Sequence, residues 1–536
     1  MGLSEPVARS VRFLAVWLPV AVLLSLLPVY FCYLIQAATG YFHDDGVYLV
    51  NGLSLASGHG FRTISLPQEL FQTKYPFLYP ALLAFLWKLF PAFPANVLAF
   101  KLLSLCATAL WSYMSYRLAL RETKSTVLAC WIAVLMLTLP WVVFLSTSTM
   151  PETLFALTST ASVLTFQDGQ NSRAGWKVAL GAVLASAAFL LRSAGLALIL
   201  SWLVLLLYRK RWRAAASFCL IATVLTGPWL AWQAAHPATN DVVGAYYTKL
   251  SYEHKTVFSS PDATSAVRAF GVNLIGALAT ICPLSGPWLG PVGSALNLLA
   301  GLLCLLGLAR YLIDCHLTLP LVWFVANIAM TAGMMFQPMR YEVPLYAVSL
   351  ILFVSGVSLV FVRIKVRPQA TVLVLFAVCA AVNVSGSFKL RQITLQQGSP
   401  TWSLARLDNW RQTMQATAWL REHTPIDTVV AANCDPIVYL FAHRKAIRLF
   451  IQDNYVLLFD PSPDKLPLGP PERLKNHLKA NHISYILMTP MKCYMEAPFL
   501  RQQLASLMRA HPAAFRLEKR FTDPGFYILS VDPGKL

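Results

Sequence analysis

Long apolar segments recur along the first 387 residues of the chain, and they constrain the fold more than any other feature of the sequence. A helix that crosses a bilayer needs about 20 apolar residues, with ~17 as a lower limit. Eleven segments reach or approach this length, namely 12–36, 92–115, 127–146, 152–167, 178–191, 194–208, 214–232, 292–309, 317–336, 343–362 and 369–387. We therefore expect a mostly α, polytopic membrane domain over residues 1–387, with about eleven spans.

Two further apolar segments are less regular. Segment 76–91 reads as a second span or as an interfacial lead-in to the next one. Segment 271–290 is broken by Pro283, Gly286, Pro287 and Gly290 and is expected to be re-entrant or interfacial. If both segments cross the bilayer, the number of spans rises to thirteen.

The charge of the chain agrees with a membrane protein. Only 12% of the residues are charged and 57% are hydrophobic, whereas about a quarter of the residues in a soluble domain are charged. The formal net charge of +19 would suit nucleic acid, but many of the basic residues lie in short clusters between apolar segments. Such clusters set membrane orientation, so we expect no nucleic-acid partner.

The basic clusters also predict the orientation. They lie at 117–124, 173–177, 209–213 and 363–367, and Arg9 and Arg12 precede the first segment. Placing all of them in the cytoplasm satisfies the positive-inside rule. Loop 37–75, loop 233–270 and the tail after residue 388 then lie outside.

The tail, 388–536, has the pattern of a small soluble α/β domain. MQATAWLREH, DPIVYLFAHR and PPERLKNHLKANH read as helices, and DTVVAAN and ISYILMTP read as short β-branched strands. Cys434 and Cys493 lie in this domain, and an extracytoplasmic location would permit a disulfide between them.

Three cations lie near outer boundaries, where the positive-inside rule does not expect them. They are Lys74, Arg192 and Arg340, the last followed by Tyr341. Each alone fits a side chain that reaches the headgroup layer. Together they suit a phosphate, because arginine offers a planar fork of donors.

Acidic residues also lie beside the outer boundaries. Asp44 and Asp45 follow the first apolar segment, and Glu152 follows Pro151, as at an ordinary helix start. Glu342 is close enough in sequence to neutralise Arg340. The outer histidines, His43, His59, His236 and His254, lack the spacing of metal ligands, so a divalent metal is not indicated.

From Asp44 onward the pattern DDGVYLVNGLSLASG predicts an amphipathic helix lying on the outer surface. Gly58 supplies a stop. Asp44 would cap the helix, and Tyr48 would support it one turn on.

These motifs resemble a known family in their order. An acid pair follows the first span, then come a Tyr, a SGHGF turn and K-x-P-x-x-x-P. STSTMPETLF, the Arg340-Tyr341 pair and WLREHTP…DPIVYLFAHRKAIRL follow. The sequence resembles the polytopic GT-C glycosyltransferases that use lipid-phosphate sugars, in particular the protein O-mannosyltransferases and the lipid A aminoarabinose transferases.

The resemblance implies roles for individual residues. Asp44 matches the catalytic carboxylate, Glu152 an acidic position in the second outer loop, and Lys74 and Arg340 the donor-phosphate site. Arg192 and Tyr341 are further candidates for that site. Asp45 and Glu152 join Asp44 as catalytic candidates, and the alternative for Asp45 is a role in supporting Asp44 or capping the helix. Gln72 and Thr73 stand before Lys74 where the aminoarabinose enzymes have an acid that helps to hold a metal, which argues against a metal and against aminoarabinose as the sugar.

The expected function is inverting transfer of a sugar from a polyprenyl-phosphate donor to an acceptor hydroxyl or phosphate at the outer face of the membrane. The acceptor is a lipid, a polysaccharide or a protein, and membrane lipids surround the spans. The expected location is the plasma (inner) membrane of a bacterium. The alternatives are a transporter or flippase of a lipid-linked anion, and a scaffold that displays the tail.

Overall fold

The computed structural model describes most of the 536 residues of the chain. The described residues are 5–34, 39–40, 43–169, 175–237, 247–248, 263–314, 317–334, 339–363, 368–397, 410–449, 471–489, 497–522 and 525–536. They form two compact units. The helical unit comprises Met1–Ile35, Lys101–Trp232 and Thr256–Arg391, and the α/β unit comprises Gln36–Phe100, Gln233–Lys255 and Gln392–Leu536.

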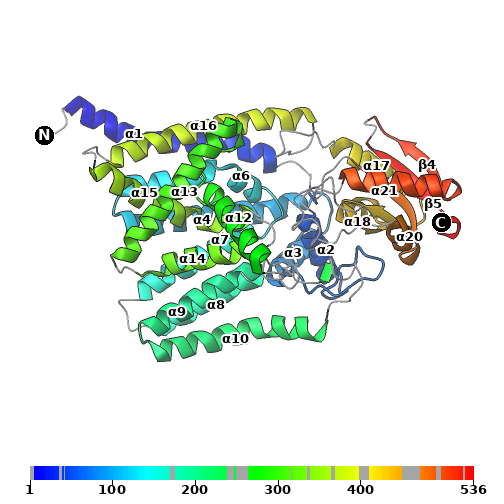
Figure 1. The fold of residues 1–536 in the computed structure, drawn as a ribbon, viewed down its shortest axis with the longest axis horizontal. Helices are drawn as coiled ribbons and strands as arrows, with labels where there is room; N and C mark the ends of the chain where they lie inside the picture. Colours follow the sequence, from blue (N-terminus) through cyan, green and yellow to red (C-terminus); the bar gives the residue numbers. More distant parts are fainter. Residues whose placement is uncertain are drawn as a thin grey trace. The chain divides into compact units, whose positions relative to one another are not determined.

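The helical unit is built from α-helices (Figure 1). They are α1 (Glu5–Leu34), α4 (Val97–Thr123), α5 (Thr126–Thr138), α6 (Pro140–Ser146), α7 (Glu152–Gly169), α8 (Gly175–Leu191), α9 (Leu196–Tyr208), α10 (Trp212–Ala235), α12 (Ala263–Thr280), α13 (Gly290–Ile313), α14 (Leu319–Ala332), α15 (Tyr346–Arg363) and α16 (Pro368–Gln397). Their length and apolar composition make the chain a multi-pass membrane protein.

The expected count of eleven spans is not confirmed. Among the described residues, five helices are long and apolar enough to cross a membrane, and six if the bent pair α5–α6 is one broken span. Pro140 lacks a backbone N–H, and the two helices of that pair meet at 69°. Other expected spans form shorter helices. The 14-residue α14 rises roughly 21 Å, less than the ~30 Å of hydrocarbon.

The two irregular apolar segments differ. Segment 76–91 forms the unbroken 12-residue α3 (Leu78–Leu89), which lies between Pro76 and Pro91. Segment 271–290 contains the end of α12, the 3₁₀ turn Pro287–Leu289 and the first residue of α13, so it is interrupted around its prolines.

Two glycines let helices α13 and α15 approach closely. A Cβ atom on Gly307 would lie 1.9 Å from the carbonyl oxygen of Leu352, and one on Gly356 would lie 1.9 Å from that of Leu303. Small residues of this kind allow helices to pack tightly in membranes.

The α/β unit contains a five-stranded mixed sheet with the strand order β2-β1-β3-β5-β4. Its strands are β1 (Val429–Ala432), β2 (Lys445–Ile447), β3 (Ile483–Met488), β4 (Phe515–Arg520) and β5 (Tyr527–Val531). β1 is parallel to β2 and β3, whereas β5 is antiparallel to β3 and β4. The predicted α/β character of the tail is confirmed.

Helices cover both faces of this sheet (Figure 1). One face packs on α20 (Pro471–Ala480) and α21 (Ala497–Ala510), and the other on α17 (Trp410–His423) and α18 (Asp435–Ala442). Alternation along β1 explains the division, because successive side chains point to opposite faces. Ala431 joins the first core, whereas Val430 and Ala432 join the second.

Part of the first loop belongs to the same unit as the sheet. Leu66 lies in the core under α20 and α21. The backbone N–H of Ala446, in edge strand β2, donates to the carbonyl oxygen of Ser65 at 2.8 Å. The expected division of the chain into residues 1–387 and 388–536 stays a prediction.

The predicted helix after the first span is confirmed as α2 (Asp44–Ala56), and Gly58 follows it with φ +81°. The expectation that this helix lies on a surface is wrong. Its first nine residues are all buried, and successive helical residues point about 100° apart, so every side is covered. It packs on α3, where a Cβ atom on Gly52 would lie 2.8 Å from Leu83.

Two expected features lie partly outside the described residues. Cys493 and His254 are among the residues that the structure does not describe. The pairing of Cys434 with Cys493 therefore stays a prediction.

His477, in α20, makes contacts that suit a neutral imidazole ring. Its Nε2 lies 2.8 Å from the carbonyl oxygen of Arg448, and its Nδ1 lies 3.3 Å from Nδ2 of Asn481. A neutral imidazole satisfies both contacts, with Nε2–H donating and Nδ1 accepting. Burial lowers the pKa of His477, against the opposing effect of the hydrogen bond to Arg448.

Lowering the pH from about 7.5 to about 5 should therefore destabilise the α/β unit. The unfolded state binds a proton near the ordinary histidine pKa of ~6.5, and the folded state binds it only at lower pH. The free energy of unfolding then falls as the pH drops through that window. Thermal unfolding at both pH values should show a smaller loss for His477→Gln, and an equal loss in the variant would contradict this assignment.

Candidate active site

Asp44 and Asp45 form the first turn of α2 and are both buried. His43, not Asp44, occupies the N-cap position, with φ +64°. Asp45 Oδ2 accepts the backbone N–H of Gly40 at 2.7 Å, so this carboxylate closes the turn before the helix. The position of both acids at the helix N-terminus stabilises negative charge.

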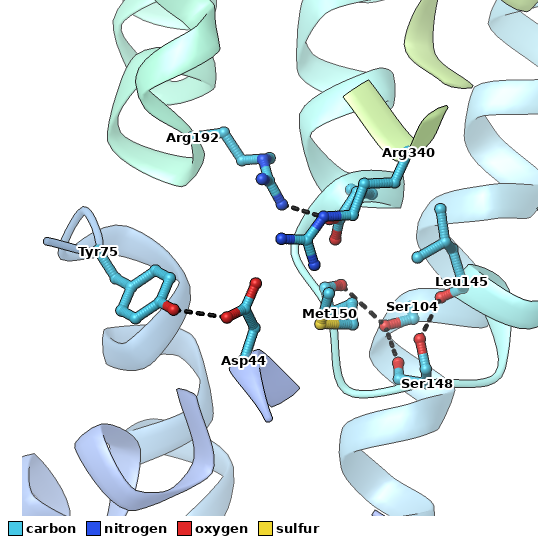
Figure 2. A network of polar contacts seen from close by, with 9 residues as sticks. Asp44, Tyr75, Ser104, Leu145, Ser148, Met150, Arg192 and Arg340 are labelled. Carbon is cyan, nitrogen blue, oxygen red and sulfur yellow. Dashed lines mark hydrogen bonds and ion pairs between the residues drawn. The ribbon is translucent and has the colours of Figure 1, made fainter. Parts of the chain in front are cut away.

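Tyr75 links Asp44 to Lys74. Its hydroxyl donates to Asp44 Oδ1 at 2.6 Å (Figure 2), and the Lys74 ammonium lies 5.2 Å from the centre of its ring. Tyr48 packs against the same ring, with centroids 4.9 Å apart. The α/β unit therefore holds one cluster around Asp44, which we call the acidic cluster. It consists of Asp44, Tyr48, Lys74 and Tyr75.

Gln72 holds the backbone of that cluster. Its Oε1 accepts the N–H of Lys74 at 2.7 Å and that of Tyr75 at 3.1 Å. Its Nε2 donates to the Thr63 hydroxyl at 3.1 Å. The neutral amide of Gln72 thus orients the backbone that carries Lys74 and Tyr75.

The helical unit holds a second cluster around Glu152, the first residue of α7. Glu152 is fully buried. The Arg192 guanidinium donates a hydrogen bond to Glu152 Oε1, and Nε of Arg340 lies 3.7 Å from the same oxygen. Both arginines are less than 10% exposed. Three charged groups far apart in sequence thus share one buried site, which we call the arginine cluster.

Tyr341 stacks beside both arginines. The guanidinium carbon of Arg192 lies 4.2 Å from the ring centre, and that of Arg340 lies 5.5 Å from it. An aromatic face attracts such cations. Proximity in the sequence suggested Glu342 as the acidic partner of Arg340. In the structure the acidic side chain beside Arg340 is Glu152.

Hydroxyl groups fix the loop that leads into Glu152. Ser104, in α4, donates to the carbonyl oxygen of Ser148 at 2.8 Å and lies 3.5 Å from that of Met150 (Figure 2). The Ser148 hydroxyl in turn lies 3.3 Å from the carbonyl oxygen of Leu145. These bonds satisfy backbone groups ahead of the helix and set the direction in which α7 begins.

Formal charge distinguishes the two clusters. The arginine cluster carries two cations for one carboxylate, and its excess positive charge suits an anionic ligand. The acidic cluster carries one carboxylate and one ammonium group. The chemical roles expected for these residues stay predictions.

Sequence reasoning overlooked Tyr75 and Ser104. Tyr75 stands beside Lys74 in the motif TKYPFLYP. Its place next to a candidate residue for the donor-phosphate site could have identified Tyr75 as a candidate too. Ser104 has no such signal. Among the described residues, no group of three His, Cys, Asp or Glu side chains is close enough to hold a metal ion.

The fold is similar to those of solved GT-C enzymes. Crystal structures of ArnT from Cupriavidus metallidurans match it at TM-scores of 0.60, bound to undecaprenyl phosphate, and 0.55, in the apo state. The bound structure is 13% identical and covers 95% of this chain and 97% of ArnT. No family model matches the chain, and neither does any curated protein sequence.

An archaeal enzyme shows the same likeness. The oligosaccharyltransferase AglB from Archaeoglobus fulgidus, in complex with an inhibitory peptide and a dolichol-phosphate, matches at a TM-score of 0.52 and 12% identity. The match covers 98% of this chain and 75% of AglB. Over nearly its whole length, the chain has the GT-C fold of the lipid-phosphate-sugar glycosyltransferases ArnT and AglB.

Proposed function

We propose that this protein is an inverting glycosyltransferase that moves a sugar from a polyprenyl-phosphate donor to an acceptor hydroxyl. Support comes from the fold, since ArnT binds undecaprenyl phosphate and AglB a dolichol-phosphate. The observation that carries the proposal is Asp44, a buried carboxylate held by the Tyr75 hydroxyl at 2.6 Å. A phosphate is the second acceptor class compatible with this chemistry.

In the proposed reaction, Asp44 acts as the base. It takes the proton of the acceptor hydroxyl as the acceptor oxygen attacks the anomeric carbon. The bond between that carbon and the phosphate oxygen breaks on the opposite face, and the electron pair goes to the phosphate. The new glycosidic bond has the inverted configuration, and polyprenyl phosphate is released.

The leaving phosphate needs positive charge instead of a proton donor. It is already an anion, unlike the sugar oxygen that a hydrolase must protonate. Arg192 and Arg340 of the arginine cluster are suited to stabilise its developing charge, and Lys74 is a further candidate. Tyr341 would hold the guanidinium planes from one side.

We assign Glu152 a supporting role in this scheme. Its carboxylate is fully buried and in contact with both guanidinium groups. A buried carboxylate in contact with two cations is suited to anchor their side chains. Asp45, whose oxygen accepts the Gly40 N–H, would likewise hold the turn before Asp44.

The basic connectors between apolar segments support an orientation with the Asp44 loop and the tail on the extracytoplasmic side. The plasma (inner) membrane of a bacterium would be the location. A flippase for a lipid-linked anion is the alternative, and it predicts donor movement without donor cleavage.

Asp44→Asn should abolish transfer. Asparagine can still accept the Tyr75 hydrogen bond, but it cannot take a proton, and a lost general base costs ~10²-fold or more in kcat. The measurement is the release of polyprenyl phosphate by purified protein in detergent, alongside the thermal unfolding midpoint. Near-normal turnover in a folded variant would remove Asp44 from the role of base.

Asp45→Asn is the matched control for this variant. It removes a charge from the same helical turn and keeps an oxygen for the Gly40 N–H. We expect kcat to fall by less than about tenfold, a change of ~1.4 kcal/mol or less in the barrier. An equal loss of kcat in both variants would mean that turnover depends on the negative charge of the turn and not on Asp44 as the base.

Two variants, Arg340→Gln and Glu152→Gln, should distinguish a residue that binds the donor phosphate from one that supports the arginine side chains. Loss of the cation should weaken binding of undecaprenyl phosphate about tenfold or more, because hydrogen bonds to charged groups contribute ~1.5–3 kcal/mol. Glu152→Gln keeps both cations and an oxygen that can accept from Arg192, so affinity should fall less than in Arg340→Gln. Glu152→Gln protein that binds normally but has no turnover would identify Glu152 as a catalytic base instead.

A further inference from the structure

A buried contact joins the start of α2 to the first turn of α18 within the α/β unit. His43 Nε2 lies 2.9 Å from Asp435 Oδ1. The two side chains are 1% and 0% exposed. The residues are 392 positions apart in the chain, and His43 precedes the proposed base, Asp44, by one residue.

The backbone of His43 is unusual. Its φ of +64° lies in the left-handed region, which a side chain with a Cβ atom adopts only at a cost. Its carbonyl oxygen accepts the N–H of Val47 at 2.9 Å, and its own N–H donates to the Gly40 carbonyl at 3.2 Å. This conformation directs the chain into α2, so the contact that holds the His43 ring also holds the direction of the first turn.

The residues after Asp435 fit closely against the same turn. A Cβ atom on Gly46 would lie 2.6 Å from Pro436 Cβ, and one on Gly40 would lie 2.6 Å from Ile437 Cγ1. Both glycines are thus needed for α18 to seat against the turn. The His43–Asp435 contact and the two close approaches thus hold Gly40, His43 and Gly46 against α18. The Tyr75 hydroxyl, in contrast, holds the Asp44 carboxylate itself.

We propose that Asp435 is a positioning residue for the reaction, acting through His43 to hold the Asp44 carboxylate in place. Asp435 touches neither the donor nor the acceptor in this account. The inference rests on the proposed function and assigns the C-terminal segment a part in it. Tail residues would thereby control the geometry of the loop that carries the base.

Asp435→Ala in the full-length chain tests this inference. We expect kcat for transfer from a polyprenyl-phosphate sugar to fall about 10–100-fold, as proton transfer depends on orientation. The donor KM should change less than about threefold. Asp435→Asn, which keeps an oxygen for His43 Nε2–H, should restore part of the lost kcat.

A matched control breaks another contact between the same two parts of the unit. Gln68 Nε2 donates to Asn481 Oδ1 at 2.7 Å, away from the turn before α2. Asn481→Ala should leave kcat close to that of the wild type. A loss in Asn481→Ala as large as that in Asp435→Ala would assign the effect to general loosening and overturn the inference.

Hydrogen exchange supplies a readout that does not depend on activity. The backbone N–H groups of the first turn of α2, including that of Val47, should exchange faster in Asp435→Ala than in the wild type or Asn481→Ala. Unchanged exchange, or an unchanged kcat in active enzyme, would overturn the role of Asp435. If the wild type consumes no polyprenyl-phosphate sugar, the proposed function fails, while faster exchange would still support the structural coupling.

Discussion

The buried charges of this protein constrain everything else in its structure. A charge removed from water is costly unless a partner compensates it. Glu152 has Arg192 and Arg340, Asp44 has the Tyr75 hydroxyl, and Asp435 has His43. Each pairing joins segments far apart in the chain, so the fold must bring those segments together before any of these groups can be buried.

This constraint explains the form of the two units. In the helical unit, the loop 147–151 leads into α7, and the Ser104 hydroxyl holds its backbone. Glu152, the first residue of α7, contacts both Arg192 and Arg340. In the α/β unit, a sheet covered by helices supports a first loop that would otherwise lack a core of its own. The proposed transfer would depend on such positioning, because catalysis requires groups that are held in place before the reaction begins.

Sequence patterns predicted many helices and strands, but they did not predict which charged side chains contact one another. Periodicity and turn residues predicted strands β1 and β3, helices α17, α18 and α20 and the helix from Asp44, but not the short edge strand β2 or strand β4. The count of eleven spans was not confirmed, because several of the expected segments form helices shorter than a full span among the described residues. The contacts of Glu152 with Arg192 and of His43 with Asp435 span 40 and 392 positions, and no spacing rule reaches that far. The motif order did bring Asp44, Lys74, Arg192 and Arg340 forward as candidates, because each is an uncommon charge beside an apolar segment.

The most direct test of the account is cleavage of the donor in the absence of a membrane. Purified full-length protein in detergent, with no bilayer and no ion gradient, would be incubated with polyprenyl-phosphate-linked pentoses, hexoses and amino sugars and a cell-envelope extract as the acceptor source. The account predicts that at least one donor is converted to free polyprenyl phosphate, with its sugar on a new acceptor in the inverted configuration. Intact donors in every reaction, together with movement of an intact donor across reconstituted vesicles, would contradict it.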